Sequence, residues 1–135
     1  MKIVMIIDKE LPVGLIANTA AVLGASLGSM VDGLVGRDLR DADGNAHLGI
    51  TTRNIPILGG TREQIKAIRA RLYDEEFAAV ATVDFNNIAQ RSLDYGDYEN
   101  ALAKAGDDAL SYLGICLCGP QKKVNSLTGS IGLLR

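Results

Sequence analysis

Apolar runs alternate along this chain with stretches of helical spacing. The segment Lys2–Ile7 is almost wholly apolar and ends at Asp8, a pattern typical of a strand that is covered on both faces. We therefore expect it to be a central first strand. Three further apolar runs predict the other strands of the main sheet, at Asn54–Leu58, Phe77–Val83 and Leu113–Cys118. Pro56 indicates an edge position for the second strand, because proline cannot donate a ladder hydrogen bond.

Two segments carry clear helix signals. Apolar residues recur at three- and four-residue steps over Val13–Met30, directly after Pro12. Within this segment a line of small residues is expected to lie close to a sheet or another helix: Ala17, Ala21, Gly24 and Gly28. Thr61 and Gln64 have the spacing of a capping box, which predicts a second helix from Thr61 to about Asp74.

The remaining elements are shorter. We expect helices at Glu99–Gly106 and Gln121–Leu127 and extended pieces at Val31–Val35 and Ser130–Arg135. Asp43 and Gly44 form a turn signal that commonly joins hairpin strands, and His47 lies just beyond it as an expected surface residue. Strands that alternate with helices predict one α/β domain over residues 1–135, a three-layer α/β/α sandwich with a mixed sheet of about four strands.

Composition narrows the classes of function. Hydrophobic residues make up 47% of the chain and charged residues 22%, which indicates a folded protein. Fourteen Lys and Arg against sixteen Asp and Glu give a net charge of −2, which argues against a large nucleic-acid footprint and leaves a small local patch open. The only histidine is His47, so a His-rich metal site is excluded, and no cofactor or metal is expected.

The cysteines and the apolar windows bear on location. Cys116 and Cys118 lie two apart in a predicted strand, where they share one face, and we interpret them as reduced core residues. The first apolar run is too short for a signal peptide, and no window is expected to approach a membrane span. The sequence therefore predicts a cytoplasmic protein that has no contact with membranes.

Polar residues gather where the first and third predicted strands end. If these two strands run in the same direction, their carboxyl ends meet at one edge of the sheet together with the start of the first helix. The result would be a cleft that binds a polar ligand or orients a water molecule. Its candidate residues are Asp8, Lys9, Glu10, Asn18, Thr19, Asp84, Asn86 and Asn87. Alternatively, Asp84 and Asn86 only cap a turn.

Two basic or acidic features have more than one interpretation. The basic stripe of the second helix is either a solvated surface or an edge that contacts phosphate, and it consists of Arg62, Lys66 and Arg69. The segment Gln90–Asp108 is acidic and contains Tyr95 and Tyr98. A long segment without strong periodicity is often a lid or a subunit contact.

Two ends of the chain resemble a known family. Ile3–Leu11 with Gly14–Ala21 resembles the first strand and helix of type II peptidyl-tRNA hydrolases, and Gly119–Val124 with Leu127–Gly129 resembles their closing segment. More closely, the run from Asp8 to Gly24 is similar to the uncharacterised bacterial family catalogued as domain of unknown function 2000, of the same fold superfamily. The resemblance implies a type II peptidyl-tRNA hydrolase-like fold, Asp84 as the match to the catalytic aspartate, and a homodimer.

The departures from the hydrolase pattern shape the functional hypotheses. Leu15, Thr19 and Val22 stand where the resemblance expects lysine, glutamine and histidine, and the acidic segment is unfavourable for tRNA phosphates. We therefore expect a protein without that activity that binds a small polar ligand in a cleft near Asp84.

Two alternatives stay open. In the first, the protein hydrolyses an aminoacyl or acyl ester, with tRNA not excluded, using Asp84 as general base and either Asn18 or the helix terminus to steady the oxyanion. In the second, the protein is a homodimer whose interface is the acidic, tyrosine-bearing segment.

Overall fold

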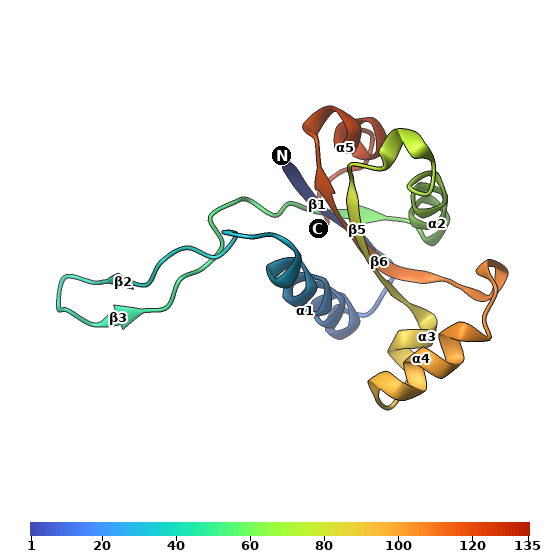
Figure 1. Cartoon of the computed structure of the whole chain (residues 1–135), viewed down its shortest axis with the longest axis horizontal. Coiled ribbons are helices and arrows are strands. Elements are labelled where there is room, and N and C mark those ends of the chain that lie inside the picture. Colours follow the sequence, from blue (N-terminus) through green and yellow to red (C-terminus); the bar gives the residue numbers. More distant parts are fainter.

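A four-stranded mixed sheet forms the centre of the molecule, and helices cover both of its faces (Figure 1). The computed structural model describes residues 1–135. The helices and strands, in chain order, are β1 (Lys2–Asp8), α1 (Val13–Met30), β2 (Leu39–Arg40), β3 (Ala46–His47), β4 (Ile57–Gly60), α2 (Arg62–Arg71), β5 (Ala81–Asn86), α3 (Asn87–Arg91), α4 (Tyr95–Ala103), β6 (Tyr112–Gly119) and α5 (Gln121–Thr128).

The strand order explains which chain segments meet. The order is β4-β1-β6-β5, with β1 parallel to β4 and antiparallel to β6, and with β5 antiparallel to β6. The strands β1, β4 and β5 therefore run in the same direction, and their carboxyl ends lie at one edge of the sheet. This arrangement confirms the expected mixed α/β sheet of four strands, with the first strand in an interior position.

Strand alternation divides the core into two halves. Val4 and Ile6 of β1 pack with the apolar residues of α2 and α5, whereas Ile3 and Met5 pack with α1 on the opposite face. Cys116 and Cys118 are free and buried in the half that faces α1, which confirms their prediction as core residues. Burial raises the pKa of the Cys116 thiol to about 12, so it is an inert core thiol.

Helix α1 has the predicted bounds but a different outer face. Its buried residues are Thr19, Leu23 and Leu27. Because these larger side chains face the sheet, most of the small-residue line is turned outward: Ala17, Ala21 and Gly28 are exposed. Only Gly24 approaches the sheet, where an added Cβ would lie 3.9 Å from Met5 Cε. The expected packing of the whole line within the chain was wrong.

The same helix also corrects the membrane expectation. By length and composition alone, α1 is long and apolar enough to cross a bilayer, with a mean hydropathy of 1.5 over its 18 residues. The expectation that no window approaches a membrane span was therefore wrong for Val13–Met30. In the structure, this helix packs on the sheet through Leu23 and Leu27.

Several element boundaries differ from the expected ones. Strand β4 begins at Ile57 and continues through Gly60, because its backbone pairs with β1 as far as Gly60 opposite Asp8. On its other side β4 pairs with the chain end: Gly59 N–H donates to the Gly132 carbonyl at 3.0 Å. This pairing confirms that the C-terminal segment docks in an extended form. Strand β5 begins at Ala81, since Phe77 is the buried residue of a 3₁₀ turn, Glu75–Phe77, that precedes it.

The middle of the chain holds one more helix than expected. Helix α3 follows β5 at once, and α4 begins at Tyr95, four residues before the expected start. The earlier start is explained by Asp94, whose side chain caps α4 by accepting from Asp97 N–H at 2.8 Å.

A hairpin projects from the body of the molecule (Figure 1). Residues 36–53, called the arm below, contain β2 and β3, and Gly44 in their turn has a φ of +84°, as the predicted hairpin requires. His47 is on the surface, where its Nε2 lies 2.9 Å from Asp41 Oδ2. The expected extended piece Val31–Val35 is mostly a turn, and only Val35 pairs across the arm, with Thr51.

Candidate functional site

Helix α2 lies over the carboxyl ends of the strands and pairs with two of their aspartates. Arg62 Nε donates to Asp8 Oδ2 at 3.0 Å, and Arg69 Nε donates to Asp84 Oδ2 at 3.0 Å. Both arginines project from the same side of α2, because they are seven residues apart, about two helical turns. The capping box at Thr61 is present as predicted and fixes where this helix begins.

Lys66 completes the basic stripe. Its Nζ donates to the carbonyl oxygens of Asp107 at 3.0 Å and Leu110 at 2.7 Å, just before β6. Every cation of the stripe is therefore used inside the chain. The expected solvated surface describes Arg62, whose side chain is 54% exposed, but the stripe as a whole ties α2 to the strand ends.

Asp84 is the centre of a connected polar group on β5. Its side chain is 21% exposed, and its Oδ1 accepts from Asn86 Nδ2 at 3.3 Å. The same Nδ2 lies 3.3 Å from the Tyr98 hydroxyl, and Asn86 Oδ1 accepts from Ala89 N–H at 2.9 Å. Asn86 is only 1% exposed, so it links Asp84, α3 and α4 as one buried connection.

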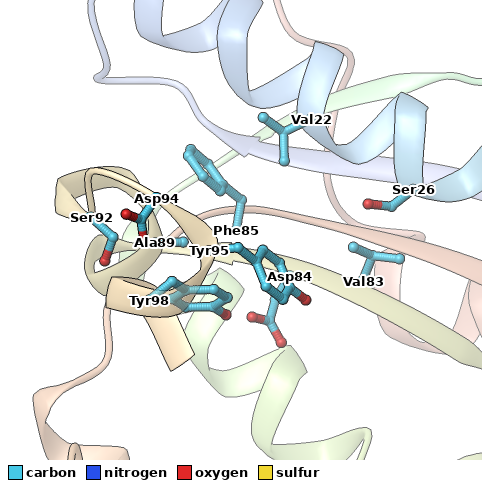
Figure 2. A pocket seen from close by; sticks show the side chains of 10 residues that line it. All are labelled: Val22, Ser26, Val83, Asp84, Phe85, Ala89, Ser92, Asp94, Tyr95 and Tyr98. Carbon is cyan, nitrogen blue, oxygen red and sulfur yellow. The ribbon is translucent and has the colours of Figure 1, made fainter. Parts of the chain in front are cut away.

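A cavity of about 350 Å³ borders this group along the outer edge of β5 (Figure 2). Such a volume suits a small ligand. The lining residues come from α1, β5 and the α3–α4 segment: Val22, Ser26, Val83, Asp84, Phe85, Ala89, Ser92, Asp94, Tyr95 and Tyr98. Figure 2 shows Val22 and Ser26 on α1 on one side of the strand and the Asp84 carboxylate directed toward the other side.

The cavity combines three kinds of binding group. Tyr95 and Tyr98 form an edge-to-face aromatic pair with ring centroids 5.8 Å apart. Asp84 and Asp94 contribute carboxylates. Because β5 is the outermost strand, backbone N–H and C=O groups on its free edge have no partner strand. A ligand at this edge therefore meets aromatic, anionic and backbone groups together.

Tyr112 lies next to this group on the neighbouring strand. It pairs in register with Asn86 and is 2% exposed. Burial, with a smaller contribution from the negative charge of Asp84, raises the pKa of Tyr112 to about 12. Tyr112 therefore stays protonated throughout the ordinary pH range.

The structure divides the predicted site residues between two places. Asp84 and Asn86 lie together as described. Asp8 and Glu10 instead border a separate cleft of about 310 Å³ with Arg62, and Asp8 Oδ1 accepts from Glu10 N–H at 3.0 Å. The side chain of Asp8 is 4% exposed, so its carboxylate is almost sealed from solvent.

The other predicted residues line neither cleft. Lys9 is exposed, and its backbone N–H donates to the Gly60 carbonyl at 3.0 Å. Thr19 is buried, and its hydroxyl donates to the Leu15 carbonyl at 2.7 Å. Asn18 is exposed on α1, one turn before Val22. Asn87 binds backbone instead: its side chain accepts from Ser111 N–H at 2.9 Å.

Asp84 is the one predicted residue among those that line the cavity, and the missed residues include three that lie outside β5 and the α3–α4 segment: Val22, Ser26 and Arg69, which pairs with Asp84. Asn18, Val22 and Ser26 share one stripe of α1 at four-residue spacing, which is the one signal that could have extended the search. The charge pattern alone could not assign Arg69 to Asp84. No group of three or more His, Cys, Asp or Glu side chains is arranged to hold a metal ion.

Comparisons with known proteins give a family and a fold. The family model described as "Protein of unknown function (DUF2000)" matches residues 1–135. A solved structure of a protein of unknown function, Atu0240 from Agrobacterium tumefaciens strain C58, is similar with a TM-score of 0.86 and 19% sequence identity over 98% of this chain and 96% of that chain. No curated protein matches the sequence. At this identity the solved structure supports the fold alone.

Proposed function

The chain belongs to the DUF2000 family of proteins of unknown function, and we propose that it binds a small polar ligand in the cavity beside Asp84 and has no peptidyl-tRNA hydrolase activity. One observation carries the proposal. A half-buried carboxylate, held by Arg69 and Asn86, borders a cavity at the free edge of a strand. Functional sites of open α/β sheets commonly lie at the carboxyl ends of strands in this way.

The charges of the cavity favour an amine. Two carboxylates border it, Asp84 and Asp94, and only one cation, Arg69, is paired with them. A protonated amine would balance the remaining negative charge, and the tyrosine rings attract cations through their faces. The apolar part of the wall, which includes Val22 and Phe85, suits a planar or apolar body. We therefore propose a small aromatic or otherwise planar amine as the ligand class.

Ester hydrolysis with Asp84 as the base has less support. Both carboxylate oxygens of Asp84 already accept hydrogen bonds, from Arg69 and Asn86. Asn18, the residue expected to steady an oxyanion, does not line the cavity. Val22, which stands at the histidine position of the resembling hydrolases, contributes only an apolar surface to the wall.

We also make a more specific proposal for the fold and one for the cellular location. We propose a type II peptidyl-tRNA hydrolase-like fold, supported by the four-stranded mixed sheet and by the chain segments that resemble that family. The free, buried thiols of Cys116 and Cys118 support a reducing compartment, which agrees with the proposed cytoplasmic location.

A thermal-shift titration with two matched compounds tests ligand binding. Tyramine and 4-hydroxyphenylacetate have the same phenol ring, but one carries an ammonium group and the other a carboxylate. We expect tyramine and related small amines to raise the melting temperature of the full chain by several degrees in a saturable way. The acid is expected to have no such effect.

Two variants distinguish ligand binding in the cavity from a general change in the stability of the protein. Asp84→Asn and Arg69→Met both break the same ion pair, but only Asp84 borders the cavity. We expect Asp84→Asn to abolish the amine effect and Arg69→Met to preserve or strengthen it. Equal loss in both variants, or equal stabilisation by amine and acid, would contradict the proposal. Hydrolysis of N-blocked aminoacyl-tRNA above the buffer rate, lost in Asp84→Asn, would establish the alternative.

A further inference from the structure

The arm presents apolar side chains that nothing in its own chain covers. Leu48 is 80% exposed, Ile50 81% and Leu39 56%. Figure 1 shows the arm extending away from the sheet and its helices. Exposed apolar groups that gather on one projecting element mark an interaction surface.

The arm nevertheless has a defined shape. Asp41 Oδ1 accepts from the N–H groups of Asp43 at 2.9 Å and Asn45 at 3.0 Å at the tip. Near the root, Gly49 N–H donates to Asp38 at 2.9 Å, and the backbones of Gly49 and Gly36 approach so closely that a side chain at Gly49 would overlap Gly36. A two-stranded hairpin without a core is marginal by itself. We therefore expect the ordered arm to pack against the surface of a partner.

Helix α1 presents the second uncovered apolar surface. Its outward residues are small and exposed, among them Gly14, Ala17, Ala21 and Ala25, and the whole helix carries no charged residue. A side chain added at Gly14 or Gly28 would meet no atom within 4 Å. An uncharged, exposed helix face of this length is unusual on a free surface, where polar residues normally cover the outer side.

The two surfaces match in length and charge. Half of the 18-residue arm, extended at about 3.3 Å per residue, spans about 30 Å, and the 18 residues of α1 span about 27 Å. The arm contains three arginines and three aspartates, so its formal charge is zero and two copies do not repel each other. The uncharged α1 adds no repulsion.

The area is sufficient for a dimer. A strip about 27 Å long and about 10 Å wide, buried on both surfaces in two symmetric contacts, amounts to about 1,100 Å². Specific interfaces begin at about this size. We propose that the partner is a second copy of this chain, and that each arm packs along the exposed face of α1 of the other copy in a two-fold dimer. This inference does not depend on ligand binding at Asp84.

Sedimentation velocity of the full chain at micromolar concentration tests the dimer. We expect a species of twice 14.3 kDa. The double variant Leu48→Asp/Ile50→Asp and the single variant Ala21→Arg should each sediment as monomers. Each substitution enters a two-fold interface twice, so we expect the dissociation constant to rise about a hundred-fold or more. The far-ultraviolet circular dichroism spectra should stay unchanged, because all three residues are exposed.

Leu93→Asp is the matched control. Leu93 is 94% exposed on the loop between α3 and α4, in the acidic, tyrosine-bearing segment. We expect this variant to remain dimeric. A monomeric wild-type chain, a dimer that Leu93→Asp alone dissociates, or a dimer insensitive to Ala21→Arg would overturn the proposal. Flotation of a monomeric chain with phosphatidylcholine vesicles would instead assign the uncovered surfaces to a membrane.

Discussion

Asp8 and Asp84 have nearly the same local chemistry but different surroundings. Each belongs to a strand of the same direction, and each accepts from an arginine of α2 at 3.0 Å. Both aspartates border a cleft, yet the side chain of Asp8 is only 4% exposed, whereas that of Asp84 is 21% exposed. The type of ion pair therefore does not decide which of the two carboxylates can meet a ligand.

The positions of the two strands in the sheet explain why the two carboxylates differ in exposure. Asp8 ends β1, which has β4 on one side and β6 on the other. Asp84 lies on β5, whose outer side has no strand and is bordered by the cavity and the α3–α4 segment. The same aspartate–arginine pair is thus a structural tie in the interior of the sheet and a ligand-accessible group at its edge.

Removing each arginine in turn should give the largest contrast between the two pairs. Arg62→Met leaves the sealed Asp8 carboxylate with only the Glu10 N–H, and we expect a loss of about 3 kcal/mol in unfolding free energy. Arg69→Met leaves Asp84 with the Asn86 amide and with the water that enters the cavity, so we expect a smaller loss of about 1 to 2 kcal/mol. Urea unfolding at neutral pH measures both values.

Arg71→Met is the control for loss of a cation on the same helix. Its closest carboxylate, Glu76, is exposed and 3.9 Å away, and its guanidinium carbon lies 5.2 Å from the centroid of the Phe77 ring, so we expect a loss below about 1 kcal/mol. Equal losses for Arg62→Met and Arg69→Met would show that burial does not separate the two pairs.

Alkaline pH should weaken the Asp84 side of the molecule through Tyr112. The pKa of Tyr112 is about 12 in the folded protein and about 10 in the unfolded chain. The folded protein holds this proton more tightly, so the contribution of Tyr112 is complete below pH 10 and is lost as the pH rises to about 12. We expect wild type to lose between about 2 and 3 kcal/mol more than Tyr112→Phe over this range in urea unfolding.

The same titration tests which aspartate acts on Tyr112. The charge of Asp84 contributes to the raised pKa, and Asp8 does not. Absorbance titration of tyrosinate should therefore show a lower Tyr112 pKa in Asp84→Asn and an unchanged one in Asp8→Asn. A shift of the same size in both variants would contradict the separation of the two sites.

Local signals predicted much of the fold, and their failures have a common cause. The bounds of α1 and the capping box at Thr61 depend on neighbours in sequence, and both were correct. The end of β4 was wrong because Gly59 and Gly60, which usually indicate a turn, here continue a strand that pairs with β1 on one side and with the chain end on the other. The pairing with the chain end joins segments more than 70 residues apart, and no local pattern encodes it.

The site was predicted only in part, again because contacts between segments far apart in the sequence leave no local pattern. The order of the strands could not be obtained from one sequence, so Asp8 and Asp84 were expected in one cleft. In the structure β6 lies between their strands, and α2 supplies a separate arginine to each. Asp84 and Asn86 were found together because they are two residues apart on one strand.

Asn86 has no counterpart beside Asp8. Its loss should therefore destabilise only the region around Asp84 and the cavity. Asn86→Ala removes the cap of α3 and the amide that joins Asp84 to Tyr98. We expect a loss of about 2 kcal/mol in unfolding free energy, from a helix cap together with buried hydrogen bonds. Hydrogen exchange should also be faster in α3 and α4 than in α2. Uniform acceleration across the sheet would mean that Asn86 supports the whole core instead.

Tyr98→Phe should have the smallest effect on the free energy of unfolding, and it tests a single hydroxyl group beside the cavity. The variant removes one hydroxyl, which lies 3.3 Å from Asn86 Nδ2, and keeps the ring that packs against Tyr95. Because Asn86 Nδ2 still bonds Asp84, we expect a loss of about 1 kcal/mol or less in urea unfolding. Tyr95→Phe is the matched control, since its side chain is 81% exposed. If Tyr98 acts only through its hydroxyl, tyramine binding should weaken in Tyr98→Phe alone; if the ring face is what binds the amine, both variants should retain it.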